Sequence, residues 1–183
     1  MNGRICKRSQ TLSYENYLQK VETRKLSELS KTDATREHDV QFKQYTRSNY
    51  KDCLALFELN CPAFFAVEER PDYQHYLKTT RDLYLLGYYG QSVVCCFGIE
   101  NRTKDIAALT WIMVHPDHHR RGYGQAMMSH FMASVAAQAT TKVLIATSQH
   151  AEAFFAKYGA TRCGFQSDGW GKGMHRVEME ICL

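Results

Sequence analysis

The sequence predicts an α/β fold in which a single mixed sheet is covered by helices. In the first half, two alternating apolar segments, residues 83–89 and 92–100, meet at Gly90-Gln91, which is typical of an antiparallel hairpin. In the second half, apolar strands alternate with helical patterns, which favours parallel pairing. A chain of 183 residues with 44% hydrophobic residues can bury one good core. We therefore expect one domain over residues 38–183, preceded by an N-terminal extension at 1–37.

The first half of this domain contains a strand, two helices and then three further strands. The strands are expected at residues 40–45, 83–89, 92–100 and 106–114. Thr46 or Ser48 can cap the first helix, which Pro62 ends. Its apolar residues are Cys53, Leu54, Leu56 and Phe57. Pro71 fits the first turn of the second helix, whose inward residues are Tyr73, Tyr76 and Leu77.

The second half alternates helices and strands. Helices are expected at residues 123–139 and 149–158, and strands at 142–147, 161–165 and 175–181. The apolar residues of the first of these helices recur at helical spacing, which indicates a core face. They are Met127, Met128, Phe131, Met132 and Val135.

The extension is predicted to be partly helical. A rough apolar stripe begins after Ser13, a plausible N-cap, and the charged residues 31–37 indicate a linker. One interpretation is a lid or dimer helix, which leaves a homodimer open. The other, which we favour because the stripe is narrow, is a helix packed loosely on the outside.

Composition excludes several classes of protein. No apolar run approaches the ~20 residues of a membrane helix, and no signal-peptide pattern opens the chain. Seven cysteines, an odd number with no Cys-x-x-Cys pair, indicate a reduced, cytoplasmic protein. Residues 1–37 carry eight Lys/Arg against five Asp/Glu, and residues 38–183 carry fifteen against fourteen. The domain therefore lacks the basic surplus of a nucleic-acid-binding surface, and we expect neither nucleic acid nor membrane as a partner.

The most informative segment is the loop at residues 119–125, between the strand 106–114 and the helix that follows. The first N–H groups of a helix have no intrahelical acceptor and carry partial positive charge. Gly122 and Gly124 let a ligand approach the backbone, and Arg120 and Arg121 add charge at the rim. The segment therefore predicts a binding site for an anionic, pyrophosphate-bearing ligand.

The spacing of the glycines narrows the choice of phosphate-bearing ligand. The third glycine of the dinucleotide fingerprint is absent, and no Gly-Lys-Ser/Thr follows as in nucleotide-triphosphate loops. The motif HRRGYG at residues 119–124 instead resembles the acyl-coenzyme A loop of the GNAT superfamily of N-acyltransferases, Gln/Arg-x-x-Gly-x-Gly/Ala. His119 departs from it at the first position. Residues 111–116 (WIMVHP) resemble the family's fourth strand and its Val-x-Pro turn. Residues 147–151 (TSQHA) and 154–159 (FFAKYG) resemble its fifth strand and following helix.

The resemblance covers about four-fifths of the chain and implies a fold, a co-substrate and a reaction. The fold is a mostly antiparallel sheet of six to seven strands with helices on both faces, splayed between strands four and five. The reaction is transfer of an acetyl group from acetyl-CoA to an unidentified primary amine of a small molecule or protein. The implied coenzyme contacts are Met113, Val114, His119, Arg120, Arg121, Gly122, Tyr123, Gly124, Gln125 and Phe155.

Acyl transfer to an amine requires a base, because an alkylamine of pKa ~10.4 is almost fully protonated at pH 7. Glu100, at the end of a strand beside the expected cleft, is our first candidate; His115, Glu178 and Glu180 are alternatives. The simplest stabiliser of the oxyanion is a backbone N–H around Met113 or Val114.

The proton donor to the thiolate is a separate question. The family's usual general acid is a tyrosine at the position that Phe155 occupies here. Tyr158, about one turn further on, is a candidate acid or a packing residue. Ser148 is a candidate donor or, as we prefer, a helix N-cap.

Other functions stay open at this stage. The absence of the family's usual tyrosine is compatible with a non-catalytic acyl-CoA-binding sensor or interaction module. The phosphate-binding loop, taken by itself, is compatible with a phosphate-binding regulatory domain unrelated to coenzyme A. Residues 64–69 and 167–173 correspond to the walls of the family's acceptor pocket, but also read as a helix start and a hairpin turn. The histidines at 115, 118 and 119 lack a ligand set of the usual spacing, so we expect no metal.

Overall fold

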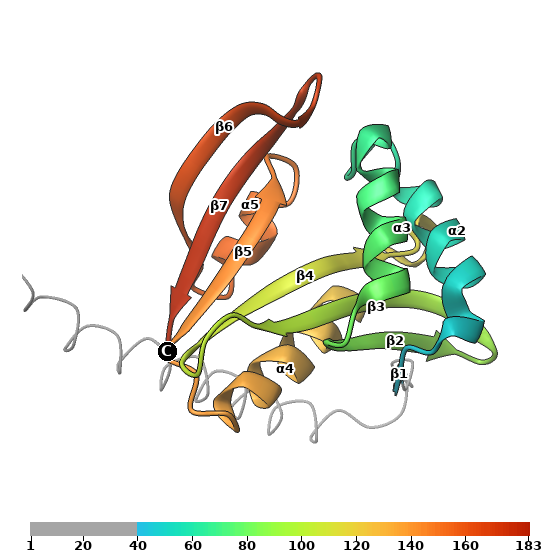
Figure 1. The fold of residues 1–183 in the computed structure, drawn as a ribbon, viewed down its shortest axis with the longest axis horizontal. Coiled ribbons are helices and arrows are strands. Elements are labelled where there is room, and N and C mark those ends of the chain that lie inside the picture. The colour runs from blue at the N-terminus through green and yellow to red at the C-terminus, as the bar shows by residue number, and fades with distance from the viewer. Residues whose placement is uncertain (1–39) are drawn as a thin grey trace, which may run out of the picture.

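The computed structural model describes residues 40–183, so the extension at 1–37 and its predicted helix lie outside the described residues. Seven strands form one sheet in the order β1-β2-β3-β4-β5-β7-β6 (Figure 1). The strands are β1 (Gln41–Gln44), β2 (Leu83–Tyr89), β3 (Ser92–Asn101), β4 (Ile106–Val114), β5 (Lys142–Ser148), β6 (Thr161–Gly171) and β7 (Met174–Cys182). The helices are α2 (Tyr50–Asn60), α3 (Arg70–Thr79), α4 (Tyr123–Ala136) and α5 (Glu152–Ala156), with short 3-10 turns η1 (Arg47–Asn49), η2 (Val67–Glu69) and η3 (Pro116–His118).

The pairing of the strands confirms the predicted mixed sheet. Strands β1 to β4 pair in an antiparallel way, as do β5, β7 and β6. The two groups are joined by the parallel pair β4–β5, which α4 connects. A parallel pair needs such a crossover, and the helix expected after residue 123 supplies it.

Helices cover both faces of the sheet, as predicted (Figure 1). On one face, the buried residues of α4 and Phe155 of α5 pack in one core cluster with inward residues of most strands. On the other face, α2 and α3 enclose a smaller cluster rich in tyrosine and cysteine. Cys95 lies in the first cluster and its neighbour Cys96 in the second, as expected for adjacent residues of a strand.

Strand β4 contains a bulge. Gly98 pairs with Thr110 and Cys96 pairs with Met113. Between these two pairs, β4 therefore contains one residue more than β3. Trp111, inside this bulge, has a φ of 46°. Such a bulge changes which residues of a strand face each side.

Three predicted boundaries were wrong. The helix expected at 123–139 ends at Ala136, and Ala139 already has a φ of 55°. The helix expected at 149–158 begins only at Glu152, because the Gln149 side chain bonds to the β6–β7 turn, donating to the Gly173 carbonyl at 2.8 Å and accepting the His175 N–H at 2.8 Å. Strand β6 continues beyond residue 165 to Gly171, because pairing with β7 resumes after an irregularity at 166–171. The predicted loop at 167–173 is therefore mostly the end of a long hairpin.

Among residues 40–183, no helix is long and apolar enough to cross a membrane.

Candidate active site

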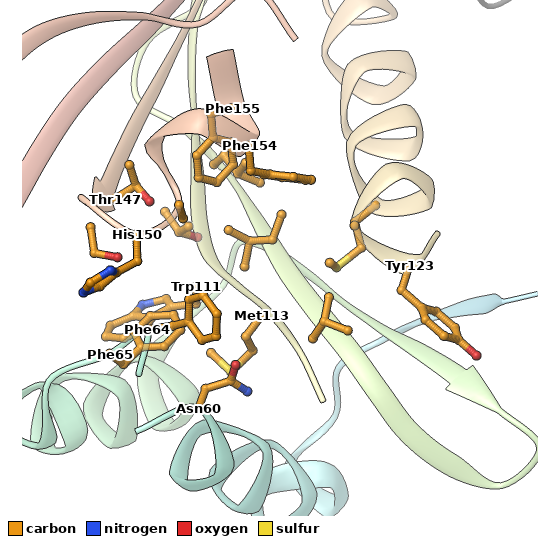
Figure 2. A pocket seen from close by; sticks show the side chains of 18 of the residues that line it. Asn60, Phe64, Phe65, Trp111, Met113, Tyr123, Thr147, His150, Phe154 and Phe155 are labelled. Carbon is orange, nitrogen blue, oxygen red and sulfur yellow. The ribbon is translucent and has the colours of Figure 1, made fainter. Parts of the chain in front are cut away.

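A cleft opens where β4 and β5 separate. The two strands pair only over Ile106–Leu109 and Lys142–Ile145, and their later residues have no partners on each other. A cavity of about 1140 Å³ lies at this opening and is lined by residues from β4, β5, α4, α5 and the α2–α3 connection (Figure 2). The divergence of the two strands thus creates a passage through the sheet that a long, thin ligand can occupy.

One end of the cavity is the phosphate loop, which we define as residues 119–125. Gly122, the N-cap of α4, has a φ of 85°, and Arg120 has a φ of 61°. The first helical hydrogen bond runs from the Ala126 N–H to the Gly122 carbonyl, so Gly124 and Gln125 have no N–H acceptor within the helix. A side chain at Gly124 would lie 3.0 Å from the Phe154 ring, so this glycine also lets α4 approach α5. The loop therefore offers N–H groups and a positive helix end to an anion.

Most of the predicted coenzyme residues line this cavity. They are Met113, Val114, His119, Arg120, Gly122, Tyr123, Gly124, Gln125 and Phe155. Arg121 is exposed and is not among the lining residues. The His119 ring turns back to β4, with Nε2 3.1 Å from the Val114 carbonyl oxygen, and lies 5.3 Å from the Phe64 ring. This histidine joins the phosphate loop to the end of β4.

Another part of the cavity wall, which meets the phosphate loop at His119, is aromatic. Phe64 and Phe65 gather around Trp111 in Figure 2, and the Phe65 ring stacks on the Trp111 ring at 6.0 Å. On the opposite side, Trp170 of β6 donates its indole N–H to the Thr147 carbonyl at 3.0 Å, and the Arg176 guanidinium lies over its ring at 4.6 Å. We call these four aromatic residues the acceptor wall.

Glu69 is a carboxyl group within this aromatic region. It is 8% exposed, lines the cavity, and accepts the Ala66 N–H at 2.8 Å. Burial raises the pKa of Glu69 to about 7, although the Ala66 N–H and Arg176 both oppose the rise. Such a carboxyl exchanges protons near neutral pH, which suits a general base.

The sequence supplied a weak signal for Glu69. Residues 64–69 were expected to wall the acceptor pocket, but no single residue within them stood out. The position three residues after Ala66, at a helix start, is where a carboxylate commonly bonds back to the backbone. That pattern predicts a cap, and only burial turns the cap into a titrating group.

Comparison with known proteins identifies the family. Residues 53–160, more than half of the chain, match the family model described as Acetyltransferase (GNAT) family. The chain belongs to the GNAT acetyltransferase family. A search of the curated proteins finds no match.

Solved structures similar to this GNAT chain share its fold at low sequence identity. Ard1 from Thermoplasma volcanium has a TM-score of 0.66 at 14% identity, covering 79% of this chain and 97% of that one. The ribosomal-protein-S18-alanine N-acetyltransferase from Escherichia coli has a TM-score of 0.64 at 14% identity, covering 79% and 95%. An aminoglycoside 6′-N-acetyltransferase complexed with coenzyme A has a TM-score of 0.63 at 11% identity, covering 78% and 96%.

The first candidate base of this GNAT domain, Glu100, does not line the cavity, although its ion-pair partner Arg102 does. Glu100 pairs in the ladder with Ala108, where β4 and β5 are still joined. Its carboxylate binds the Arg102 guanidinium at 2.8 Å. Sequence reasoning placed Glu100 near the cleft because it ends a strand, but β3 runs toward the closed end of the splay.

The side chains of the alternative bases are also bonded to neighbouring residues. Glu178 binds Arg176 at 2.9 Å and Glu180 binds Lys142 at 2.9 Å. The Nδ1 atom of His115 accepts the Asp117 N–H at 3.2 Å. None of these three residues lines the cavity.

Both candidate proton donors line the cavity. Tyr158 follows α5 and packs against Phe154, with ring centroids 5.2 Å apart. Ser148 ends β5 and is 5% exposed. The preferred interpretation of Ser148 as a helix cap was wrong, because the N-cap of α5 is Ala151. The turn at 149–151 separates Ser148 from the helix.

Within residues 40–183, no three His, Cys, Asp or Glu side chains lie close enough to hold a metal ion.

Proposed function

We propose that this protein transfers the acetyl group of acetyl-CoA to a primary amine of a small molecule or of a protein. One observation carries the proposal: a single cavity connects the N-terminus of α4 to Glu69, a buried carboxyl of pKa about 7. The first feature suits a pyrophosphate and the second suits an ammonium that must lose its proton. Membership of an acetyltransferase family supports the reaction, and the coenzyme A complex of the similarly folded aminoglycoside 6′-N-acetyltransferase supports the donor.

The residues of the phosphate loop fit a coenzyme A pyrophosphate. The N–H groups of Gly124 and Gln125 bind phosphate oxygens, with the positive end of α4 behind them. Arg120 supplies charge at the rim. The arm of the coenzyme would then lie in the opening between β4 and β5. The acetyl carbonyl group, at the end of this arm, would lie in the same opening.

Two side chains transfer protons: Glu69, and one of the two hydroxyl residues Tyr158 and Ser148. Glu69 removes the proton of the ammonium, which would otherwise leave almost no nucleophile at pH 7. When the C–N bond forms and the C–S bond breaks, the nitrogen carries a second proton that it must lose and the sulfur leaves as a thiolate. Tyr158 or Ser148 gives its proton to that thiolate, whose ordinary pKa is near ~8.5, and regains a proton from the nitrogen. A backbone N–H of Met113 or Val114 stabilises the negative charge that develops on the carbonyl oxygen.

The first experiment is a thermal-shift titration with acetyl-CoA, coenzyme A and ADP. A ligand at a hundred-fold excess over its dissociation constant adds about 2.7 kcal/mol to the free energy of unfolding. We expect both coenzyme forms to stabilise the protein and ADP to do so much less. Absence of any shift would refute the proposal, and equal shifts with all three would favour a phosphate-binding regulatory domain.

A second candidate function is a non-catalytic acyl-CoA sensor. The observation that favours it is Phe155, which stands where the family's tyrosine is usual and is 2% exposed in the core. The two functions are separated by release of free thiol from acetyl-CoA with a panel of amines. Turnover with any amine supports the transferase, whereas tight binding without turnover supports the sensor.

We also propose a cytoplasmic location, supported by the six cysteines of residues 40–183, all of which are free thiols. The boundary of the extension at residue 37 and a homodimer remain predictions.

A further inference from the structure

A chain of buried polar side chains lies between α3 and the sheet. It consists of Tyr73 on α3, Tyr84 on β2 and Cys96 on β3, which we call the hydroxyl–thiol network. All three are at most 1% exposed, and none lines the cavity. The two tyrosine hydroxyls are 2.6 Å apart, and the Tyr84 hydroxyl lies 3.0 Å from the Cys96 sulfur. Buried polar groups at such distances are held in one arrangement, because each loses its partner if another moves.

The network ends on the backbone of β4. The carbonyl oxygen of Trp111 lies 3.4 Å from the Tyr84 hydroxyl and 3.9 Å from the Cys96 sulfur. Three protons satisfy the chain when Tyr73 donates to Tyr84, Tyr84 to Cys96, and the Cys96 thiol to the Trp111 carbonyl. Burial raises the pKa of both tyrosines well above the usual value, so both keep their protons at neutral pH.

The residue on which the network ends has an unfavourable backbone conformation. Trp111 has a φ of 46°, in the left-handed region that costs a residue with a side chain about 1–2 kcal/mol. Its ring is held by Tyr73 at 4.8 Å and by stacking on Phe65. Ring packing and the carbonyl contacts together offset that cost.

The bulge decides what β4 presents to the cleft. Trp111 and Met113 pack in the core cluster that α2 and α3 enclose. Ile112 and Val114 pack on the opposite face, in the cluster that contains α4. Without the extra residue, each of these side chains would point to the opposite face. Trp111 would leave the acceptor wall, and the cleft-lining end of β4 would present different groups.

We propose that the hydroxyl–thiol network holds the β4 bulge in place and thereby positions Trp111 and the end of β4 for acetyl transfer. Tyr73, Tyr84 and Cys96 are positioning residues in this scheme, because they touch neither the coenzyme site nor the acceptor wall except through Trp111. The effect on catalysis rests on the proposed function, whereas the effect on the bulge does not.

The principal test compares Tyr84→Phe with Tyr45→Phe. Tyr45 is a matched control, because its hydroxyl also donates to a backbone carbonyl, that of Leu77 at 2.9 Å, and its ring packs on Tyr84, but its hydroxyl bonds to α3 and not to β4. We expect Tyr84→Phe to lower kcat about ten-fold while KM for acetyl-CoA stays unchanged, since small misplacements of reacting groups are costly and the phosphate loop is intact. Tyr45→Phe should lower Tm but leave kcat unchanged. Equal kcat in the two variants, or loss of kcat in proportion to Tm in both, would overturn the proposal.

Conservative rescue and amide exchange complete the test. Cys96→Ser keeps a hydrogen-bonding atom and should retain more kcat than Cys96→Ala. Hydrogen exchange of the amides at residues 110–114 should accelerate in Tyr84→Phe and not in Tyr45→Phe, which needs no turnover to measure. If the wild-type protein acetylates no amine, the proposed function fails, and this exchange pattern alone supports or overturns the role of the network.

Discussion

The carboxyl group of Glu69 combines a structural bond with a titration near neutral pH. One oxygen accepts the Ala66 N–H at the start of η2, which fixes the side chain, while burial raises its pKa to about 7. A free carboxyl of glutamate titrates near ~4.3, where it is a poor base for an ammonium. The same burial that makes Glu69 useful also makes its ionised form unfavourable for folding.

Glu69→Gln is therefore expected to lower activity and raise stability. The variant cannot accept a proton, so kcat/KM should fall and the loss of wild-type rate below pH 7 should disappear from the pH profile. Between pH 4.5 and 7, the folded wild-type protein binds the proton more tightly than the unfolded chain, so its stability falls as pH rises through this window. The variant lacks this loss and should be more stable at pH 8, by about 2 kcal/mol, with the difference vanishing near pH 4.5.

Denaturant unfolding at pH 4.5 and 8, with kinetics across the same range, measures both effects. A wild-type rate that does not decline below pH 7 would exclude Glu69 as the base.

We expect Trp170, which lines the cavity, to contact the acceptor amine and not the coenzyme. Its indole N–H bonds to the Thr147 carbonyl, and its ring supports Arg176. Trp170→Phe removes the bond and part of the wall, so KM for the amine should rise about ten-fold while KM for acetyl-CoA stays constant. Phe165→Ala on the same strand is a control, because Phe165 is 54% exposed and does not line the cavity. A rise in KM for acetyl-CoA in Trp170→Phe would assign this residue to the coenzyme instead.

At the scale of elements, the junction of β4, the phosphate loop and α4 forms the side of the cavity where we expect the coenzyme pyrophosphate to bind. The loop reverses direction through two residues of positive φ, Arg120 and Gly122, before the helix begins. The turn aims the free end of α4 at the cavity. A loop of another geometry would leave the same helix with its N-terminus facing solvent.

Alanine substitutions at Gly122, in this junction, and at Gly90, in the turn between β2 and β3, distinguish an effect on binding from an effect on stability. Both have positive φ, 85° and 61°, with no atom within 4 Å of an added Cβ, but only Gly122 lines the cavity. Alanine at either position should cost about 1 kcal/mol of folding free energy. Only Gly122→Ala should weaken coenzyme A binding, by about ten-fold, since its methyl group occupies space at the anion site. Calorimetric titration of both variants provides the comparison, and equal affinities would contradict the loop assignment.

At the scale of the whole molecule, the sheet consists of two antiparallel parts joined by four paired residues on each of β4 and β5. Beyond this junction the parts diverge: α2 and α3 lie beside the first part, and the β6–β7 hairpin forms the outer strands of the second (Figure 1). Contacts between the hairpin and the α2–α3 connection bridge the opening: a side chain at Gly171 would lie 2.9 Å from the Ala66 Cβ. A ligand in the cleft therefore touches both parts of the sheet.

Acetyl-CoA is expected to protect the two diverging strand ends from hydrogen exchange together. The amides of residues 110–114 and 146–148 should exchange more slowly with acetyl-CoA, because the coenzyme arm lies between these strands. Residues 106–109 and 142–145, already paired, should change little. ADP, which lacks the arm, serves as the control and should protect only the phosphate loop. Protection of one strand end alone would place the arm elsewhere.

The sequence by itself determined the order and type of the elements and the phosphate loop. These features depend on local chemistry: alternating apolar residues make strands, and glycine permits the turn at Gly122. Two of the wrong boundaries, at α5 and β6, were set by contacts from distant segments, such as the bonds of Gln149 to the β6–β7 turn.

Only the tertiary structure decided which side chains meet in the cleft. Glu100 and Glu69 are both carboxylates near the ends of elements, and nothing local distinguishes them. The direction of β3 places Glu100 at the closed end of the splay beside Arg102, whereas the packing of η2 against β6 buries Glu69 at the cavity. The bulge at Trp111 is equally invisible in the sequence, because it depends on partners from α3, β2 and β3. Burial and neighbouring charges set the pKa of a group, and strand pairing sets the face on which it lies. Burial, neighbouring charges and strand pairing all arise only when segments far apart in the chain come together.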